Sequence, residues 1–171
     1  MTGSQTSGSQ LYVGLMSGTS MDGVDAALID LGNPPGKLID THFLPYPEDV
    51  RAEALSLNTP GPNELDRSSR LSIRLADLYA GAVNGLLRES GVNASQVVAI
   101  GCHGQTVRHR PELGYTLQLG DPARLAELTG INVVADFRRR DIAAHGQGAP
   151  LVPAFHRAMF ASPAINRVVV N

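Results

Sequence analysis

Small and polar residues form a dense cluster between two apolar segments near the N-terminus. The stretch YVGLMSGTSMDGVDAALID carries this cluster at Ser17–Gly23. Gly18 and Gly23 have no side chain that would keep a ligand away from the backbone, and successive amides in a turn form a concave site for an anion. Three hydroxyl donors lie in the same turn, on Ser17, Thr19 and Ser20. The turn is therefore predicted to bind phosphate.

Asp22 does not suit a site for a bare anion, because a carboxylate repels phosphate. Magnesium is commonly held by one or two carboxylates together with phosphate oxygens and water. We therefore expect Asp22 to face a Mg²⁺ ion, directly or through water. A plainer interpretation stays open, in which the Ser and Asp side chains of a tight hairpin bond only to their own backbone.

The residues GTSM, Gly18–Met21, also occur around the nucleophilic serine of subtilisin-like proteases. In those enzymes the serine begins a helix late in the chain, after the catalytic Asp and His. Here the segment leads into an expected strand near the N-terminus, and neither Asp nor His precedes it. The sequence therefore does not favour a protease.

The elements around the turn indicate a mixed α/β domain. Leu11–Met16 and Val24–Ile29 are predicted to pair as antiparallel strands, with Leu38–Leu44 as the third strand of a meander. Further apolar, β-branched runs predict strands at Val97–Cys102, Tyr115–Leu119, Ile131–Ala135 and Arg167–Asn171. Asp136–Gly148 is expected to be a polar loop.

The longest predicted helix runs from about Pro62 to Ser90. An apolar stripe follows its length, and Gly81 and Gly85 within the stripe predict a close approach of another backbone. Three shorter helices are predicted, at Glu48–Leu57, at Pro122–Thr129 with Asp121 as N-cap, and at Pro150–Phe160.

Three strands followed by helix, strand, helix and strand is the order of ribonuclease H-like domains. The superfamily of sugar kinases, actin and Hsp70 duplicates this domain and binds ATP between the copies. We therefore predict an α/β chain, a ribonuclease H-like domain of the actin-like ATPase and sugar kinase fold, with a mixed sheet and helices on both faces. The expected organisation is a flexible tail at residues 1–10, the domain at 11–160, and the start of a truncated second domain at 161–171.

Composition argues against several classes of protein. A net charge of −2 gives no basic field for nucleic acid, and no apolar run approaches the roughly 20 residues of a membrane span. A single cysteine, Cys102, rules out an internal disulfide framework and fits a reducing cytoplasm. Because it lies in a predicted strand, we expect it to be a buried apolar residue rather than a nucleophile paired with the next residue, which would point to the opposite face.

Three ordered blocks carry a specific resemblance. GLMSGTSMDGVDAALID, IGCHGQTVRHRP and LQLGDPARLAELTGINVVADFRRRDIAAHGQGAPLVPAFH resemble anhydro-N-acetylmuramic acid kinases, over nearly all of Leu11–Asn171. The resemblance implies phosphorylation of 1,6-anhydro-N-acetylmuramic acid by ATP with hydrolytic opening of the anhydro ring, which yields N-acetylmuramic acid 6-phosphate. It places the protein in peptidoglycan recycling in the cytoplasm.

The resemblance also implies site residues. It assigns ATP binding to Gly18, Thr19, Ser20, Met21, Asp22, Gly23, Val24 and Asp25. It suggests substrate contacts at His103, Gln105, Asp136, Arg138 and Gln147. An imidazole and an amide can bond to sugar hydroxyls or to the N-acetyl group, and an arginine of the FRRRD segment can pair with the lactyl carboxylate. The plainer alternatives are a histidine that caps its strand, solvated arginines, and a loop at Gln147 that only turns the chain.

The chain departs from the family at its C-terminus. Family members are longer, and in them the strand that begins at Arg167 leads to a second phosphate turn and a catalytic aspartate. No catalytic residue is therefore assigned before Asn171, and the isolated chain is expected to be inactive. Alternatives are another sugar kinase or nucleotide hydrolase of the same fold, and a non-enzymatic nucleotide-binding module. The expected partners are ATP, Mg²⁺ and a sugar, with neither nucleic acid nor membrane; a homodimer is left open.

Overall fold

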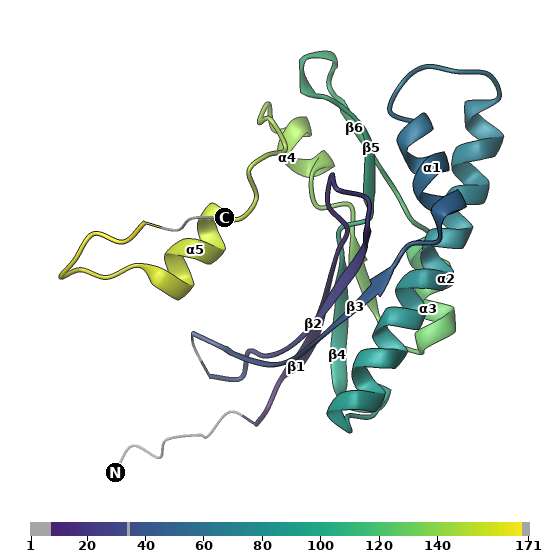
Figure 1. Cartoon of the computed structure of the whole chain (residues 1–171). Helices are drawn as coiled ribbons and strands as arrows, with labels where there is room; N and C mark the ends of the chain where they lie inside the picture. Colours follow the sequence, from purple (N-terminus) through teal and green to yellow (C-terminus); the bar gives the residue numbers. More distant parts are fainter. Residues whose placement is uncertain (1–7, 34, 169–171) are drawn as a thin grey trace, which may run out of the picture.

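A five-stranded mixed sheet forms the centre of the chain in a computed structural model, which describes residues 8–33 and 35–168 (Figure 1). Its strands, in chain order, are β1 (Leu11–Met16), β2 (Gly23–Asp30), β3 (Lys37–Pro45), β4 (Val97–Cys102) and β7 (Val133–Ala135). Their order across the sheet is β3-β2-β1-β4-β7. The first three strands form an antiparallel meander, whereas β4 is parallel to β1 and β7 is parallel to β4. The predicted mixed sheet is therefore confirmed.

Alternation along the strands gives the sheet one strongly apolar face. Val13 and Leu15 of β1 are buried on the same side as Ile100 of β4, because successive side chains of a strand point to opposite faces. The same alternation in β2 buries Val24 and Leu28. These residues belong to the hydrophobic core that the helices close.

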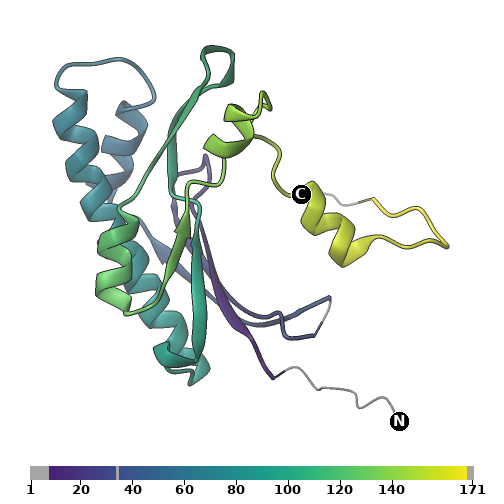
Figure 2. The ribbon, with the colours of Figure 1, turned by 180° about the vertical axis from the view of Figure 1, so that it is seen from behind.

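Three helices cover this apolar face, as Figures 1 and 2 show from opposite sides. They are α1 (Glu48–Ser56), α2 (Glu64–Ser90) and α3 (Pro122–Thr129). The predicted stripe of α2 is buried, with Leu75 and Leu86 fully enclosed. Gly85 was predicted to allow another backbone to approach, but the group that approaches it is a side chain, because a Cβ atom there would lie 2.6 Å from Nε2 of His42 on β3.

A separate two-stranded hairpin extends from the carboxyl end of β4. It consists of β5 (Gln105–Arg110) and β6 (Tyr115–Leu119), joined by the short 3₁₀ helix η2 (Pro111–Leu113). A second 3₁₀ turn, η1 (Ala94–Gln96), precedes β4. The sequence predicted β6 but not β5, so the hairpin itself was not expected.

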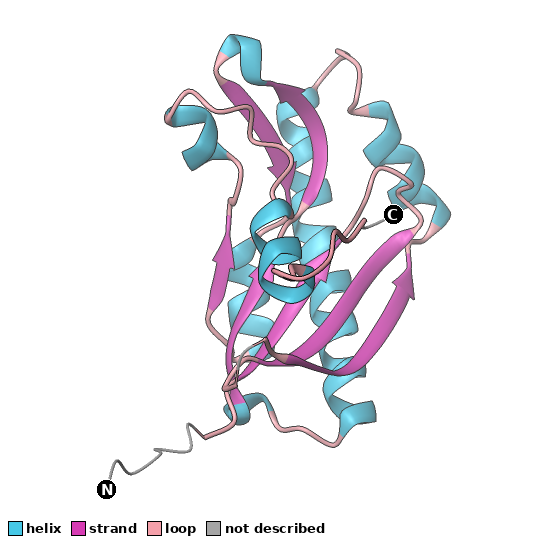
Figure 3. Cartoon of the chain, turned by 90° about the vertical axis from the view of Figure 1, so that its left-hand side faces the viewer, coloured by secondary structure: helices cyan, strands magenta, loops and turns pink. Residues whose placement is uncertain are grey.

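The C-terminal segment lies on the other side of the sheet from α1–α3. It carries α4 (Arg139–Ala143) and α5 (Pro153–Phe160), and α5 stands in front of the strands when the molecule is turned by 90° (Figures 1 and 3). Helix α4 falls inside the segment that was predicted to be a loop. Pro153 occupies the first turn of α5, where its missing amide hydrogen costs nothing.

Element boundaries differ from the prediction where a local conformation intervenes. Helix α2 begins at Glu64 because Asn63 adopts a left-handed conformation, with φ of 55°, which the helix cannot include. Asp121 caps α3 as expected, since its Oδ1 accepts from the Arg124 amide at 3.0 Å. Residues 161–168 form neither helix nor strand, and the rest of the strand predicted at 167–171 falls outside the described residues.

The described part of the expected N-terminal tail contacts the sheet. Ser9 Oγ donates to Oδ2 of Asp30 at 2.8 Å, and the Gln10 amide donates to Oδ1 of the same carboxylate at 2.9 Å. Residues 1–7 of that predicted tail lie outside the described residues. Across residues 8–33 and 35–168, none of the helices has the length and apolar character needed to cross a membrane.

Candidate nucleotide and sugar site

The predicted phosphate turn joins β1 to β2 as a compact β-turn. The Met21 amide donates to the Gly18 carbonyl at 3.2 Å, which places Thr19 and Ser20 at the exposed tip. Within the described chain, the amides of these two tip residues have no backbone or side-chain acceptor. Two free amides and the Thr19 hydroxyl on one turn form a suitable anion site.

Asp22 is exposed beside this tip. The Ser20 hydroxyl donates to its Oδ1 at 2.6 Å, and this hydrogen bond is the main cause that lowers the pKa of the Asp22 carboxyl; the charge of Arg51 acts in the same direction. The carboxylate is therefore ionised at neutral pH. Among the residues the structure describes, there is no cluster of three His, Cys, Asp or Glu side chains that could hold a metal ion. A single ionised carboxylate still fits Mg²⁺, which takes most of its other ligands from phosphate and water.

The other predicted ATP residues differ in accessibility. Met21, Gly23 and Val24 are buried, whereas Asp25 is exposed on β2. A Cβ atom on Gly23 would lie 2.5 Å from the carbonyl oxygen of Leu44 and 2.6 Å from the ring of Phe43. Gly23 therefore allows β3 to pack closely, a role that differs from the ligand approach inferred from the sequence.

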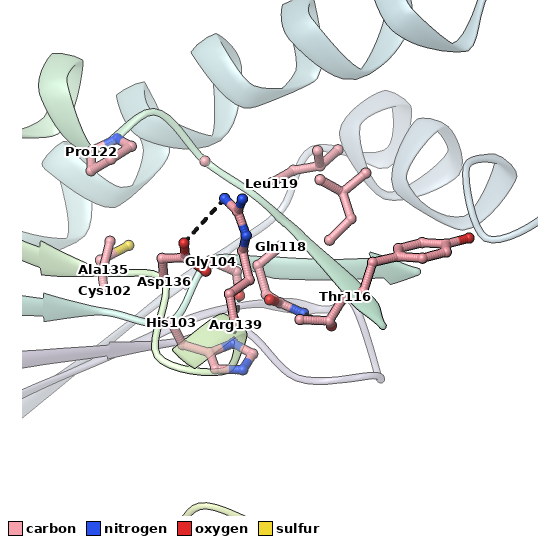
Figure 4. A pocket seen from close by; sticks show the side chains of 13 residues that line it. Cys102, His103, Gly104, Thr116, Gln118, Leu119, Pro122, Ala135, Asp136 and Arg139 are labelled. Carbon is pink, nitrogen blue, oxygen red and sulfur yellow. Dashed lines mark hydrogen bonds and ion pairs between the residues drawn. The ribbon is translucent and has the colours of Figure 1, made fainter. Parts of the chain in front are cut away.

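A cavity of about 500 Å³ opens at the carboxyl ends of β4 and β7 (Figure 4). Ligands of parallel α/β sheets commonly bind at this edge. His103 and Asp136, two of the predicted substrate residues, line the cavity, and Arg139 contributes a charged side chain from α4. Their contacts with substrate stay predictions. The β5–β6 hairpin supplies the opposite wall, with Tyr115, Thr116, Leu117, Gln118 and Leu119. A second cavity of about 480 Å³ adjoins it and shares Tyr115, Asp136 and Arg139.

His103 is a buried, neutral imidazole with a fixed tautomer. Its Nδ1 lies 2.6 Å from the Gly104 carbonyl oxygen, which can only accept, so Nδ1 carries the proton. Its Nε2 then accepts from Nε of Arg138 at 2.9 Å. Burial is the main cause that lowers the pKa of His103, and the charge of Arg138 lowers it further, while the bond to Gly104 opposes both.

Arg138 holds the loop after β7 in place rather than lining the cavity. In addition to its bond to His103, it donates from Nη1 to the Gly148 carbonyl at 2.6 Å. The Gly148 amide in turn donates to Oδ2 of Asp141 at 2.6 Å. Burial lowers the pKa of the Arg138 guanidinium. The arginine that reaches the cavity is Arg139, which pairs with Asp136 at 3.2 Å and is drawn with this contact in Figure 4.

The remaining predicted substrate residues, Gln105 and Gln147, lie outside the first cavity. Gln105 is buried, and its Nε2 donates to the Gly18 carbonyl of the phosphate turn at 3.2 Å. Its Oε1 is buried without a hydrogen-bond partner among the described residues. Gln147 is exposed on the loop after α4. Their predicted contacts with substrate stay predictions.

Sequence reasoning missed two parts of this site. The wall itself, β6, was predicted as a strand, but its pairing into a hairpin was missed because β5 was not expected as a strand. Tyr46 and Tyr79, which approach the phosphate turn from behind, were missed because their contacts with Ser17 are long-range; Tyr79 OH lies 3.0 Å from Ser17 Oγ. A polar tyrosine on the apolar stripe of α2 was the one local signal, since a buried Tyr hydroxyl needs a partner.

Comparison with known proteins decides between the families that this geometry allows. Residues 10–171 match the sequence profile of the anhydro-N-acetylmuramic acid kinases. The chain belongs to this family. It is 58% identical to the anhydro-N-acetylmuramic acid kinase of Nitrosospira multiformis over 162 residues, which cover 94% of the chain and 44% of that protein. The corresponding kinase of Nitrosomonas europaea is 55% identical over 162 residues, with 94% and 45% covered.

A third anhydro-N-acetylmuramic acid kinase, from Bordetella petrii, is 58% identical over 164 residues, with 95% of the chain and 43% of that protein covered. The chain therefore spans less than half the length of these relatives. Membership of the kinase family agrees with the predicted α/β fold of actin-like ATPases and sugar kinases, and with the mixed sheet observed here.

Proposed function

We propose that this chain forms the nucleotide-binding and sugar-binding part of a kinase that transfers a phosphoryl group from ATP to 1,6-anhydro-N-acetylmuramic acid. The observation that carries the proposal is the attachment of the phosphate turn to the cavity. Ser17 Oγ donates to the Gly104 carbonyl at 3.2 Å, and Gln105 Nε2 donates to the Gly18 carbonyl at 3.2 Å. A triphosphate at the turn and a sugar in the cavity would be neighbours, as phosphoryl transfer requires.

On the nucleotide side, the free amides of Thr19 and Ser20 and the hydroxyl of Thr19 bind phosphate oxygens, while the Ser20 hydroxyl donates its only proton to Asp22. Asp22 holds Mg²⁺, directly or through water, and the ion supplies positive charge that offsets the charge of the phosphates. Met21, Gly23 and Val24 act through the packing of the turn, because they are buried. The Gly18 carbonyl stays engaged by Gln105, so the nucleotide meets the amide side of the turn.

On the sugar side, the cavity walls bind and orient the substrate. The guanidinium of Arg139 pairs with the lactyl carboxylate, which distinguishes a muramic sugar from a plain hexose. Asp136, which lines the same cavity, accepts a hydrogen bond from a sugar hydroxyl. Gln147 reaches the sugar only if its loop moves toward the cavity, since it is exposed outside it.

The complete reaction opens the anhydro ring as the phosphoryl group is transferred. Water adds to the anomeric carbon, the bond from that carbon to O6 breaks, and O6 receives the phosphoryl group, which gives N-acetylmuramic acid 6-phosphate and ADP. We assign no base for the water to the residues of this chain. This reaction returns a peptidoglycan fragment to metabolism in the cytoplasm.

A coupled assay of ADP release tests the function directly in the full-length gene product. We expect turnover with ATP and 1,6-anhydro-N-acetylmuramic acid, and none with glucose or N-acetylglucosamine. In H₂¹⁸O the product should carry one heavy oxygen, at its anomeric position. A matched variant, Asp22→Asn, keeps the shape of the side chain but should lower the affinity for Mg²⁺-ATP. Faster turnover with glucose, or a product without the label, would refute the proposal.

A further inference from the structure

A directed series of hydrogen bonds runs behind the phosphate turn. Tyr46 OH donates to Tyr79 OH at 3.3 Å, and Tyr79 OH lies 3.0 Å from Ser17 Oγ. Ser17 Oγ donates its only proton to the Gly104 carbonyl at 3.2 Å, so Tyr79 must donate to Ser17. All three hydroxyls belong to buried residues, with Ser17 2% exposed and Tyr79 1% exposed.

The Gly104 carbonyl is a junction, because it accepts two hydrogen bonds from two different parts of the site. One comes from Ser17, directly before the phosphate turn, and the other comes from Nδ1 of His103 at 2.6 Å. A carbonyl oxygen has two lone pairs and can accept both. The peptide is closely packed against β6, since a Cβ atom on Gly104 would lie 2.7 Å from the Leu119 carbonyl oxygen.

From this junction the series continues into the sugar side. His103 accepts from Arg138 at 2.9 Å, and Arg138 donates to the Gly148 carbonyl at 2.6 Å. Arg138 directly precedes α4, whose first residue is Arg139, which lines the cavity. The position of the cavity arginine therefore depends on a hydrogen-bonded path that begins at Ser17.

We propose that Ser17 is a positioning residue, which fixes the phosphate turn and, through the Gly104 carbonyl, also fixes the His103–Arg138 pair beside the sugar cavity. Ser17 itself touches neither ligand. This inference rests on the proposed function, since it names the residue that holds the two binding sites in register. If the Ser17 hydroxyl contributed to stability alone, its removal would change the affinities for the two ligands no more than the removal of any other buried hydroxyl.

The test uses four variants of the full-length gene product, three at successive steps of the path and one control. Ser17→Ala removes the junction bond. Tyr79→Phe removes the two bonds of the Tyr79 hydroxyl, to Ser17 and from Tyr46, and leaves the bond from Ser17 to Gly104 in place. Arg138→Lys changes the hydrogen-bond geometry on the sugar side. Thr129→Val is the matched control, because the buried Thr129 hydroxyl donates to the Leu125 carbonyl at 2.8 Å in α3, away from both sites. Affinities are measured by calorimetry with Mg²⁺-ADP and with 1,6-anhydro-N-acetylmuramic acid, alongside kcat and thermal unfolding.

We expect Ser17→Ala to lower the affinity for both ligands by about tenfold, because it removes one buried hydrogen bond that holds the binding elements. Tyr79→Phe should weaken the binding of the nucleotide alone, and Arg138→Lys should weaken the binding of the sugar alone. Thr129→Val should lower the melting temperature without changing either affinity. If Ser17→Ala resembles Thr129→Val, or changes one ligand only, the inference is wrong. If Ser17→Ala does not fold, an unchanged nucleotide affinity of Tyr79→Phe overturns it. A wild-type protein that binds neither ligand would instead overturn the proposed function, and this inference with it.

Discussion

The Nε atom of Arg138 lies 2.9 Å from Nε2 of His103, and burial, together with the charge of Arg138, lowers the pKa of the imidazole and favours its neutral form. A protonated imidazole would present a hydrogen atom to a guanidinium that can only donate. The pair therefore joins the loop after β7 to the end of β4 only while His103 stays uncharged. Sequence reasoning expected both side chains to contact substrate, whereas the geometry gives each of them a protein partner.

Acid should weaken this pair. Burial, first, and the charge of Arg138 lower the pKa of His103 below its ordinary value of 6.5. Below pH 6.5 the unfolded chain therefore binds a proton that the folded chain resists, so the contribution of His103 to stability is complete above this pH and is lost as the pH falls. Thermal unfolding of wild type and His103→Gln between pH 8 and pH 5 measures it, over a range chosen to span about 6.5.

The contrast between the two proteins is the readout of that experiment. The melting temperature of wild type should fall further in acid than that of His103→Gln. The glutamine side chain can still accept a hydrogen bond from Arg138 and has no proton to gain. Arg138 stays charged throughout, and the neighbouring Cys102 thiol stays neutral because burial raises its pKa to about 11. Parallel curves for the two proteins would show that His103 does not titrate in this way.

Arg139 should decide the preference for an acidic sugar. Its ion pair with Asp136 is exposed, so Arg139→Ala should change the free energy of unfolding by less than about 1 kcal/mol. Loss of a charged hydrogen bond to the lactyl carboxylate should lower the affinity for 1,6-anhydro-N-acetylmuramic acid by about tenfold or more. Calorimetry should show no such change for 1,6-anhydro-N-acetylglucosamine, which has no lactyl group.

Arg140→Ala serves as the comparison for this prediction. Arg140 lines only the second cavity, whereas Arg139 lines both. The Arg140 variant should therefore lose less affinity for the acidic sugar. A larger loss in Arg140→Ala than in Arg139→Ala would assign the carboxylate to the second cavity.

The two glycines that bracket the phosphate turn should respond differently to alanine. A Cβ atom on Gly18 would have Ser20 Oγ at 3.8 Å as its nearest neighbour. The Gly18→Ala protein should therefore fold normally and lose only affinity for the nucleotide. On Gly23 it would lie 2.5 Å from the Leu44 carbonyl oxygen, so Gly23→Ala should destabilise the fold by about 1–3 kcal/mol. Urea unfolding and nucleotide binding separate the two effects. Equal losses of stability would contradict the assigned roles.

The sequence predicted most of the sheet, because the main strands are apolar and bounded by turn residues. β1 and β4 were predicted at their observed limits for this reason, since both are rich in buried aliphatic side chains. A turn at Ser17–Gly23 was predicted from its small and hydroxyl-bearing residues, and the structure has a turn between β1 and β2; that it binds phosphate stays a prediction. Both the strands and this turn could be predicted from the types of the residues that form them.

The hairpin wall could not be predicted in the same way. β5 has the sequence QTVRHR, whose strand conformation depends on β6 and on ion pairs far along the chain rather than on apolar alternation. Arg108 donates to the Leu57 carbonyl at 3.1 Å and pairs with Glu64 at 2.5 Å. The close approach of β3 to Gly23 is equally non-local, which is why that glycine was first interpreted as a ligand contact.

Cys102 should be slow to alkylate although it lines the cavity at the carboxyl end of β4, where the sugar is proposed to bind. Burial raises the pKa of its thiol to about 11, and the thiolate is the nucleophile, so at pH 8 roughly one molecule in a thousand is reactive. Iodoacetamide should therefore label the folded protein far more slowly than the urea-unfolded protein, with a rate that rises as the pH is raised toward 10. An anhydro sugar bound in this cavity, as proposed, should slow labelling further, whereas Mg²⁺-ADP alone should not. Rapid labelling at pH 8 that the sugar does not affect would mean that Cys102 is neither buried nor part of the sugar cavity in solution.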